Sequence, residues 1–340
     1  MKKKRLSQQQ LSRIQKNQDA HANKASQGSA ESNLTPNTLG AQRQGLVITH
    51  FGQQLDIEAL DGDDQGQIFR CFQRSNLDPL ITGDRVIWQQ GEPTGVVVAG
   101  HPRRSFLQRP NKYNQLKPVA ANIDRIVIVI APLPEPHFNL IDRYLVAAAV
   151  SGIQPLILLN KTDLLNAANQ ANIDSMLALY ERLGYDTTRA SCHKREGLQA
   201  LNQHLADHTS IFVGQSGVGK SALVNALLPD ANTLEGKLSE AADKGRHTTT
   251  SARLYHLLQG GDLIDSPGIR EFGLWHMNAS DVIKGFAEIS PFIGQCKFTD
   301  CKHETETACR LQEAVKEGLI DPRRLRSYQQ ILNSMETDYR

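Results

Sequence analysis

Residues 214–221 read GQSGVGKS, a glycine-rich stretch between two segments of different character. TSIFV at 209–213 is a short β-like run, and SALVNALL at 221–228 continues with helical spacing. A strand, a glycine-rich turn and a helix are the setting in which G-x-x-x-x-G-K-S binds phosphate. The stretch therefore predicts a nucleotide-binding α/β domain, and the alternative is a glycine-rich turn that holds no ligand.

Each part of this loop has a chemical reason in such a site. Gly214 and Gly219 allow backbone conformations that a side chain would block, and the loop amides and the helix N-terminus hold phosphate. We expect Lys220 to reach the β- and γ-phosphates and Ser221 to ligate Mg²⁺. The predicted nucleotide contacts here are Gly214, Gln215, Ser216, Gly217, Val218, Gly219, Lys220, Ser221 and Ala222.

Length and composition fit a protein of several domains. A chain of 340 residues suggests two or three domains, and 39% hydrophobic with 22% charged residues is ordinary for a soluble protein. No apolar run reaches the ~18–20 residues that span a bilayer, and the basic start leads into no apolar segment, so we expect no secretory signal. Three of the five cysteines cluster near the end, which is no disulfide framework, and we expect a reduced, cytoplasmic setting.

The first 45 residues are basic and poor in apolar side chains. They carry eight Lys or Arg against Asp19 and Glu31, a net charge of +6, and they lack aromatic residues. Such a segment cannot bury enough apolar surface to fold alone. We interpret residues 1–45 as a disordered arm that binds nucleic acid; the alternative is a solvated tail that aids solubility.

Residues 46–110 have the pattern of a small barrel. LVITHF, QIFRCF, DRVIWQ and TGVVVAG are short β-like runs separated by Asp- and Gly-rich turns. This spacing predicts a five-stranded oligonucleotide-binding (OB) fold. Phe72 or Trp88 would offer stacking surface, although both aromatics are also candidates for the barrel core, Trp88 above all. The arginines that would contact phosphates are Arg70, Arg74, Arg103, Arg104 and Arg109, and residues 103–118 read as a polar linker.

Half of a nucleotide site precedes the phosphate loop. DRIVIVIA at 124–131 and PLILLN at 155–160 are apolar runs typical of parallel strands buried on both faces, with a helical pattern between them. Asn160, Lys161, Thr162 and Asp163 follow the second run, where α/β sheets bind ligands. The Asp163 carboxylate can accept two hydrogen bonds from guanine, and it would reject adenine, which lacks the 2-amino group.

Further residues of the predicted site flank these elements. Asn160 can tie its loop to neighbouring backbone, and the Lys161 stem can cover a purine face. A small-residue turn at Ser191 and Cys192 would present backbone amides to the guanine carbonyl. Beyond the phosphate loop, we expect an outer-shell Mg²⁺ contact from Asp265, a γ-phosphate contact from the Gly268 amide, and an Mg²⁺ ligand from Thr249 or Thr250 in a mobile switch.

The order of these motifs is permuted relative to a common GTPase. A common GTPase runs phosphate loop, switch threonine, D-x-x-G, N-K-x-D and then a Ser-Ala turn, whereas here N-K-T-D and Ser-Cys come first. In this order the chain resembles the circularly permuted GTPases of bacterial ribosome assembly. The flanking modules narrow the resemblance to the ribosome-small-subunit-dependent GTPase A family over residues 46–340. Cys192 departs from the family pattern, in which alanine is commoner, but its small side chain should fit.

Residues 296–309 read CKFTDCKHETETAC and predict a metal site. Three thiolates and one imidazole, from Cys296, Cys301, His303 and Cys309, suit tetrahedral Zn²⁺ with no position open for chemistry. The family resemblance implies zinc at the same four positions; the alternative is chance clustering. The basic residues around them are Lys297, Lys302, Arg310, Arg323, Arg324 and Arg326, which suit RNA contact or a solvated face of the helix expected over 310–335.

The residue that orients the attacking water is missing from its usual place. Many GTPases have Gln directly after D-x-x-G, but this chain has Ile269, whose side chain cannot hydrogen-bond water. Intrinsic hydrolysis should therefore be slow. His247, in the expected switch, is the candidate catalytic residue; the alternatives are that it packs the switch or contacts RNA.

The sequence predicts a three-module, Mg²⁺-dependent GTPase. The modules are an OB barrel (46–110), a circularly permuted GTPase domain (118–275) and a helical zinc-binding module (276–340), and a disordered basic tail (1–45) precedes them. The resemblance implies binding to the small (30S) ribosomal subunit and its rRNA, a role in late maturation of that particle, and GTP hydrolysis stimulated by it. We expect a monomer. The alternative is an RNA-binding assembly factor that holds GTP without turnover, whereas Asp163 argues against an ATPase.

The connection after Asp265–Gly268 leads directly into the C-terminal module. Contacts of that loop with the γ-phosphate would therefore reposition the module through a short mechanical link. This coupling is a hypothesis drawn from connectivity.

Overall fold

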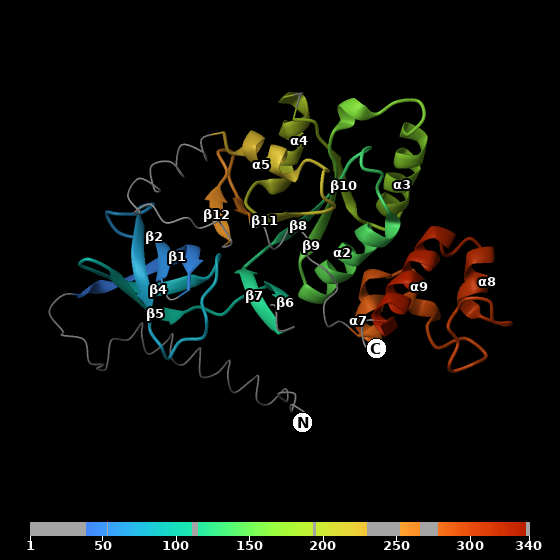
Figure 1. Ribbon diagram of the computed structural model, residues 1–340, viewed down its shortest axis with the longest axis horizontal. Helices are drawn as coiled ribbons and strands as arrows, with labels where there is room; N and C mark the ends of the chain where they lie inside the picture. The colour runs from blue at the N-terminus through green and yellow to red at the C-terminus, as the bar shows by residue number, and fades with distance from the viewer. Residues whose placement is uncertain are drawn as a thin grey trace.

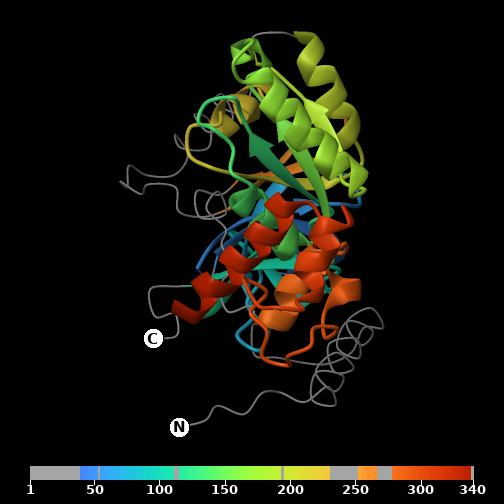
Figure 2. The same ribbon diagram turned by 90° about the vertical axis from the view of Figure 1, so that its right-hand side faces the viewer.

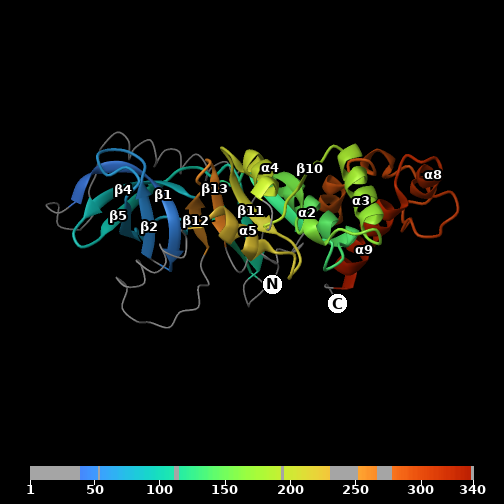
Figure 3. The same cartoon turned by 90° about the horizontal axis from the view of Figure 1, so that it is seen from above.

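The computed structural model describes residues 39–52, 54–110, 115–192, 195–229, 252–265 and 278–337. Three modules lie in a row, with an α/β domain between a β-barrel and a helical C-terminal module (Figures 1 and 3). No helix among the described residues is both long and apolar enough to cross a membrane.

The N-terminal module is a closed five-stranded barrel of the expected OB-like type. Its strands are β1 (Leu39–Phe51), β2 (Gln54–Ala59), β3 (Ile68–Gln73), β4 (Arg85–Gly91) and β5 (Gly95–Gly100). The sheet closes because β1 pairs with both β2 and β4, while β5 joins β3 to β4. Trp88 is 0% exposed at the centre of the barrel core, so the core interpretation of this aromatic is right.

The barrel begins earlier than predicted. β1 starts at Leu39, so residues 39–45 belong to the barrel and not to a disordered tail. Arg43 explains the difference, because its guanidinium lies 5.5 Å from the Trp88 ring and pairs with Asp64 at 2.9 Å. Pairing with acidic residues of the turn after β2 lets a polar segment join the sheet.

The connection to the next module is also more ordered than the predicted linker. β6 (Phe106–Pro110) and β7 (Leu116–Ala121) form an antiparallel pair that overlaps the linker predicted over residues 103–118. Leu107 and Ala120 are buried against the α/β core, which stabilises the pair. Proline is tolerated there because a two-stranded sheet has only edge strands.

The α/β domain is a mostly parallel sheet with helices on both faces. Its sheet order is β10 (Asp186–Arg189), β9 (Gln154–Leu159), β8 (Arg125–Ile130), β11 (Thr209–Val213), β13 (Asp262–Asp265) and β12 (Arg253–His256). Only β12 runs antiparallel to its neighbour β13. The helices of this domain are α2 (Phe138–Ser151), η1 (Thr162–Leu164), α3 (Gln170–Arg182), α4 (Arg195–Leu205) and α5 (Lys220–Leu227).

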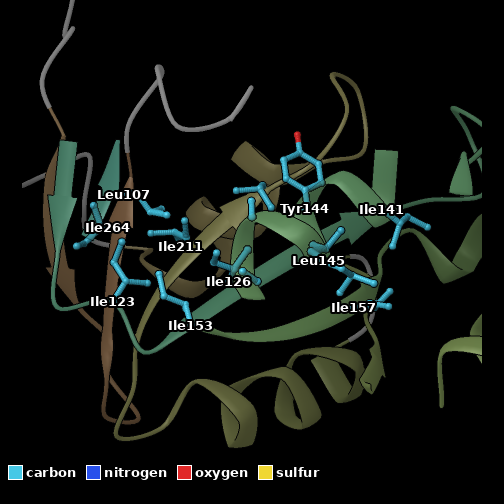
Figure 4. Packing of buried hydrophobic residues seen from close by; sticks show 14 of the residues in the cluster. Leu107, Ile123, Ile126, Ile141, Tyr144, Leu145, Ile153, Ile157, Ile211 and Ile264 are labelled. Carbon is cyan, nitrogen blue, oxygen red and sulfur yellow. The ribbon is translucent and has the colours of Figure 1, made fainter. Parts of the chain in front are cut away.

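Continuous apolar strands fit this arrangement because both of their faces are buried. Ile126 of β8 and Ile157 of β9 face Ile141 and Leu145 of α2, as Figure 4 shows. The alternate strand residues, such as Val127, point to the opposite layer with α4 and α5.

The C-terminal module packs on α2 and α3 of the α/β domain (Figures 1 and 2). Its elements are α7 (Ala279–Val282), η2 (Ile283–Gly285), η3 (Ser290–Phe292), α8 (Arg310–Lys316) and α9 (Pro322–Thr337). Residues 317–321 separate α8 from α9, so the helix expected over 310–335 is two helices.

Arg324 lies at the centre of this interface and is 0% exposed. Its guanidinium pairs with Glu288 at 2.6 Å and with Asp142 of α2, and it stacks 4.2 Å from the Phe286 ring. Asp142 also accepts a hydrogen bond from the Tyr180 hydroxyl of α3 at 2.7 Å. The prediction that Arg324 offers charge to RNA is therefore wrong, because the side chain joins two modules.

Candidate nucleotide site and candidate metal centre

The GQSGVGKS stretch connects β11 to α5, as its sequence predicts. Gly214 has φ +138°, and a Cβ there would lie 2.3 Å from the Val129 carbonyl oxygen. Gly219 has φ +97°, and a Cβ there would lie 2.4 Å from Asn160 Nδ2. Both positions therefore exclude a side chain, which lets the loop backbone lie close to Val129 and Asn160.

Lys220 folds back over this loop from the first turn of α5. Its ammonium donates to the Gly214 carbonyl at 2.6 Å and to the Gln215 carbonyl at 2.8 Å. The residue is 8% exposed, so the charge is placed beside the loop and does not extend into solvent. A lysine held in this way can reach phosphate oxygens that the loop amides hold.

Asn160 and Lys161 tie the loop after β9 to the phosphate loop. Asn160 is buried, and its side-chain amide donates to the Val218 carbonyl at 2.9 Å. Lys161 has φ 55°, and its ammonium donates to the Gly217 carbonyl at 2.6 Å. The two motifs, far apart in the sequence, therefore form one continuous surface.

Asp163 lies beside the turn that follows β10. The Ser191 hydroxyl donates to the Asp163 carboxylate at 2.5 Å, and the Thr162 amide donates to the Ala190 carbonyl at 3.3 Å. These bonds leave the Asp163 carboxylate in a fixed position at the sheet edge. Burial, together with the nearby Asp163 charge, raises the pKa of the half-buried Cys192 thiol, so this side chain stays a neutral thiol at pH 7.

Asp265 completes the described part of this edge. It ends β13, which runs parallel to β11 with Ile211 opposite Ile264, so Asp265 and Gly214 lie at the same end of adjacent strands. The remaining predicted residues lie outside the described part of the chain: His247, Thr249, Thr250, Gly268 and Ile269.

Residues 131–137, which read APLPEPH, also border this site and were not singled out in the sequence. The Leu133 carbonyl accepts from Lys161 at 3.3 Å, and a Cβ on Gly217 would lie 3.6 Å from Pro134. The segment follows the carboxyl end of β8, which is the neighbour of β11. Its position at that edge is the signal that could have identified it.

The Cys/His cluster of the C-terminal module could hold a metal ion. One ligand atom from each of Cys296, Cys301, His303 and Cys309 lies within 4.8 Å of every other. Cys296 Sγ is 3.4 Å from His303 Nδ1 and 3.9 Å from Cys309 Sγ. The Gln312 side chain donates to the His303 carbonyl at 2.8 Å and so supports the backbone of one ligand. No other such group of three or more side chains occurs in the described ranges.

Comparison with known proteins matches the chain to one GTPase family over almost its whole length. A family model described as RsgA GTPase matches residues 100–275. The chain is 53% identical to the small ribosomal subunit biogenesis GTPase RsgA of Pseudomonas putida over 99% of both proteins. It is also 53% identical to the protein of the same name from Azotobacter vinelandii, over 100% of both.

Two solved structures share the fold. YjeQ from Thermotoga maritima superposes with a TM-score of 0.69 and 26% identity, covering 86% of this chain and 98% of that one. YloQ, described as a circularly permuted GTPase, superposes with a TM-score of 0.68 and 25% identity, covering 91% and 99%. The resemblance in motif order is thus confirmed, and this chain is a GTP hydrolase that belongs to the RsgA GTPase family.

Proposed function

We propose that this protein binds the small ribosomal subunit and acts late in its maturation, with GTP hydrolysis that the particle stimulates. The observation that carries the proposal is the match, at 53% identity over almost the full length, to GTPases named for small ribosomal subunit biogenesis. A match of this length includes both flanking modules as well as the nucleotide site. We place the protein in the cytoplasm, as a monomer.

The sheet edge supports the assignment of residues to the nucleotide. Asp163 would accept from the guanine ring, the amides at Ser191 and Cys192 would face its carbonyl, and Asn160 would hold the two loops together through Val218. The amides of residues 214–222 and the Lys220 ammonium would bind the phosphates.

Magnesium fits the oxygen donors at the same edge. Ser221 offers a hydroxyl at the start of α5, and Asp265 offers a carboxylate at the end of β13. Oxygen ligands of this kind suit Mg²⁺, which would neutralise phosphate charge during hydrolysis. We assign a further ligand to Thr249 or Thr250 and a γ-phosphate contact to the Gly268 amide.

One face of the barrel supports contact with rRNA. Ile68, Arg70 and Phe72 alternate along β3 and point to the same side, with Phe72 42% exposed. Arg70 also lies 5.0 Å from the exposed Phe51 ring. Exposed aromatic rings beside arginine are suited to stacking on unpaired bases. Arg70 and Arg103 each pair with an acidic side chain, so part of their charge is neutralised.

The proposed function is tested by multiple-turnover phosphate release at saturating GTP, with and without purified small ribosomal subunits. We expect slow release alone and at least a roughly tenfold rise with small subunits, since partner-supplied groups accelerate related GTPases by far more. Large ribosomal subunits serve as the control and should give no rise. An equal rate under all three conditions contradicts stimulation by the small subunit, and only an absence of phosphate release under all three favours a factor that holds GTP without significant turnover.

Zinc is the metal that we propose for the Cys/His cluster. Zn–S bonds of about 2.3 Å in a tetrahedron place two sulfurs about 3.8 Å apart, and Cys296 and Cys309 are 3.9 Å apart. Three thiolates and an imidazole leave no open position, so the ion would have a structural role.

The purified protein is therefore expected to carry about one zinc ion per chain, measured by elemental analysis. A Cys301→Ala, Cys309→Ala double variant should lose it, because two ligands cannot complete a tetrahedral site. Cys192→Ala is the matched control, since this thiol lies outside the cluster, and it should keep full zinc content. Full zinc in the double variant would reject the ligand set.

A further inference from the structure

The barrel and the GTPase domain share a strand. β12 pairs along one side with β13, where Arg253 is opposite Asp265. On its other side β12 meets β1 of the barrel, where Arg253 is opposite Thr49. One eleven-stranded sheet therefore runs from the guanine end of the GTPase domain into the barrel.

Two barrel hydroxyls bind a single carbonyl at the start of this strand. Thr49 Oγ1 and Thr82 Oγ1 each donate to the Ala252 carbonyl oxygen at 2.8 Å. Thr49 is 3% exposed, Thr82 is 0% exposed and Ala252 is buried, so water does not compete for these bonds. Both lone pairs of that oxygen are thus used by residues of another module.

The far end of β12 is held by the barrel as well. His256 hydrogen-bonds Asp262 of β13 and Glu58 of β2, each at 2.6 Å. The hydrogen bond with Asp262 has the largest effect on the pKa of His256 and the one with Glu58 the next largest, and together they raise this pKa to about 10. The imidazolium therefore stays charged at neutral pH and bridges a barrel carboxylate to a GTPase carboxylate.

The fixed end of β12 lies next to the catalytic end of the sheet. In the antiparallel ladder of β12 and β13, Arg253 lies opposite Asp265, the residue expected beside Mg²⁺. In the sequence, only Ser251 separates Ala252 from Thr250. The Ala252 carbonyl is therefore the point nearest Thr250 in the sequence at which the barrel is joined to the backbone that connects two expected Mg²⁺ contacts.

We propose that Thr49 and Thr82 are positioning residues for GTP hydrolysis, which act by fixing the Ala252 carbonyl and thereby β12 and Asp265. The barrel is then a structural part of the hydrolytic centre and not only a surface for RNA. The inference concerns hydrolysis by the protein alone and does not depend on the proposed ribosomal partner.

The test is a Thr49→Val, Thr82→Val double variant, which keeps side-chain shape and removes both hydroxyls. We expect intrinsic turnover at saturating GTP to fall by about tenfold, and the Mg²⁺ concentration for half-maximal rate to rise several-fold, as expected when a buried carbonyl loses its partners. Affinity for GDP, measured by a fluorescent analogue, should change by less than about threefold, because guanine and phosphate contacts come from other elements.

Two further variants separate positioning from general destabilisation. Thr49→Ser, Thr82→Ser keeps both hydroxyls and should restore turnover and the Mg²⁺ requirement to near wild type. Ser105→Ala removes another buried hydroxyl, which donates at 2.6 Å to the carbonyl of Ile123, a residue outside β12. This variant should leave turnover and the Mg²⁺ requirement unchanged. Wild-type turnover and Mg²⁺ requirement in the valine variant would overturn the proposal. Equal losses in the valine and Ser105→Ala proteins would overturn it too.

Discussion

Asp163→Asn is expected to lower the affinity of the protein for GTP by about 10²–10⁴-fold. Guanine offers two donors, its ring NH and its 2-amino group, and only an ionised carboxylate accepts both. Hydrogen bonds to charged groups contribute about 1.5–3 kcal/mol each. In asparagine the bond from the ring NH loses its charge assistance and the amide NH2 faces the 2-amino donor, so both charge-assisted bonds are lost, which gives the stated range at about 1.4 kcal/mol per tenfold change. The Ser191 hydroxyl, which donates to this carboxylate at 2.5 Å, holds the acceptor in place and leaves it no freedom to compensate.

The same variant should gain affinity for xanthosine triphosphate, because xanthine has a carbonyl oxygen where guanine has the 2-amino group. The asparagine amide can donate to that oxygen. Equilibrium competition of GTP, xanthosine triphosphate and ATP against a fluorescent guanine nucleotide measures all three affinities. Ser191→Ala is the matched control, and it should lose much less GTP affinity because the carboxylate remains. Equal affinity of the wild-type protein for ATP and GTP would contradict the assignment of Asp163.

The parts of the site that sequence predicts best are local. A β run, a glycine-rich turn and a helix occupy one continuous segment, and their conformation follows from residues that are neighbours in the chain. The apolar strands and the edge position of Asn160 follow in the same way from the burial of both sheet faces. The tie from Asn160 to Val218 also follows, once both loops are placed at that edge.

The features that sequence does not predict depend on partners far along the chain. Arg43 reads as one of many charges in a basic arm, yet it pairs with Asp61 and Asp64 of the barrel. Arg324 reads as a surface charge beside the cysteines, yet it binds Asp142, 182 residues earlier. The Ala252 carbonyl has no sequence signal at all, since any residue supplies the same acceptor. Burial and pairing at such distances are properties of the fold and not of a local pattern.

The interface around Arg324 bears on how the C-terminal module responds to nucleotide. The module is anchored to α2 by the buried Arg324–Asp142 ion pair, and removing one partner of such a pair is costly. Movement driven only by the connection after Asp265 would have to break these contacts. The coupling hypothesis therefore stays a prediction, and it requires α2 to move together with the module.

His247→Ala is expected to reduce GTP hydrolysis by about 10²–10⁴-fold, the range for a lost general acid–base group. Ile269 leaves the attacking water without the glutamine that many GTPases place after D-x-x-G. His247 precedes the switch threonines and is our candidate to orient that water. His247 and Ile269 both lie outside the described ranges. GTP affinity should stay close to that of wild type, because the guanine and phosphate contacts that we propose come from the loops after β9, β10 and β11.

The loss should appear mainly in turnover stimulated by small ribosomal subunits, where the switch would be ordered. Ser221→Ala provides the contrast, since weaker Mg²⁺ coordination should lower the basal and the stimulated rate alike. The deciding measurement is stimulated turnover of the His247→Ala protein at saturating GTP. A rate within about twofold of wild type is far too small a loss for an acid–base group, and it would transfer the role to the ribosome or to another residue of the switch.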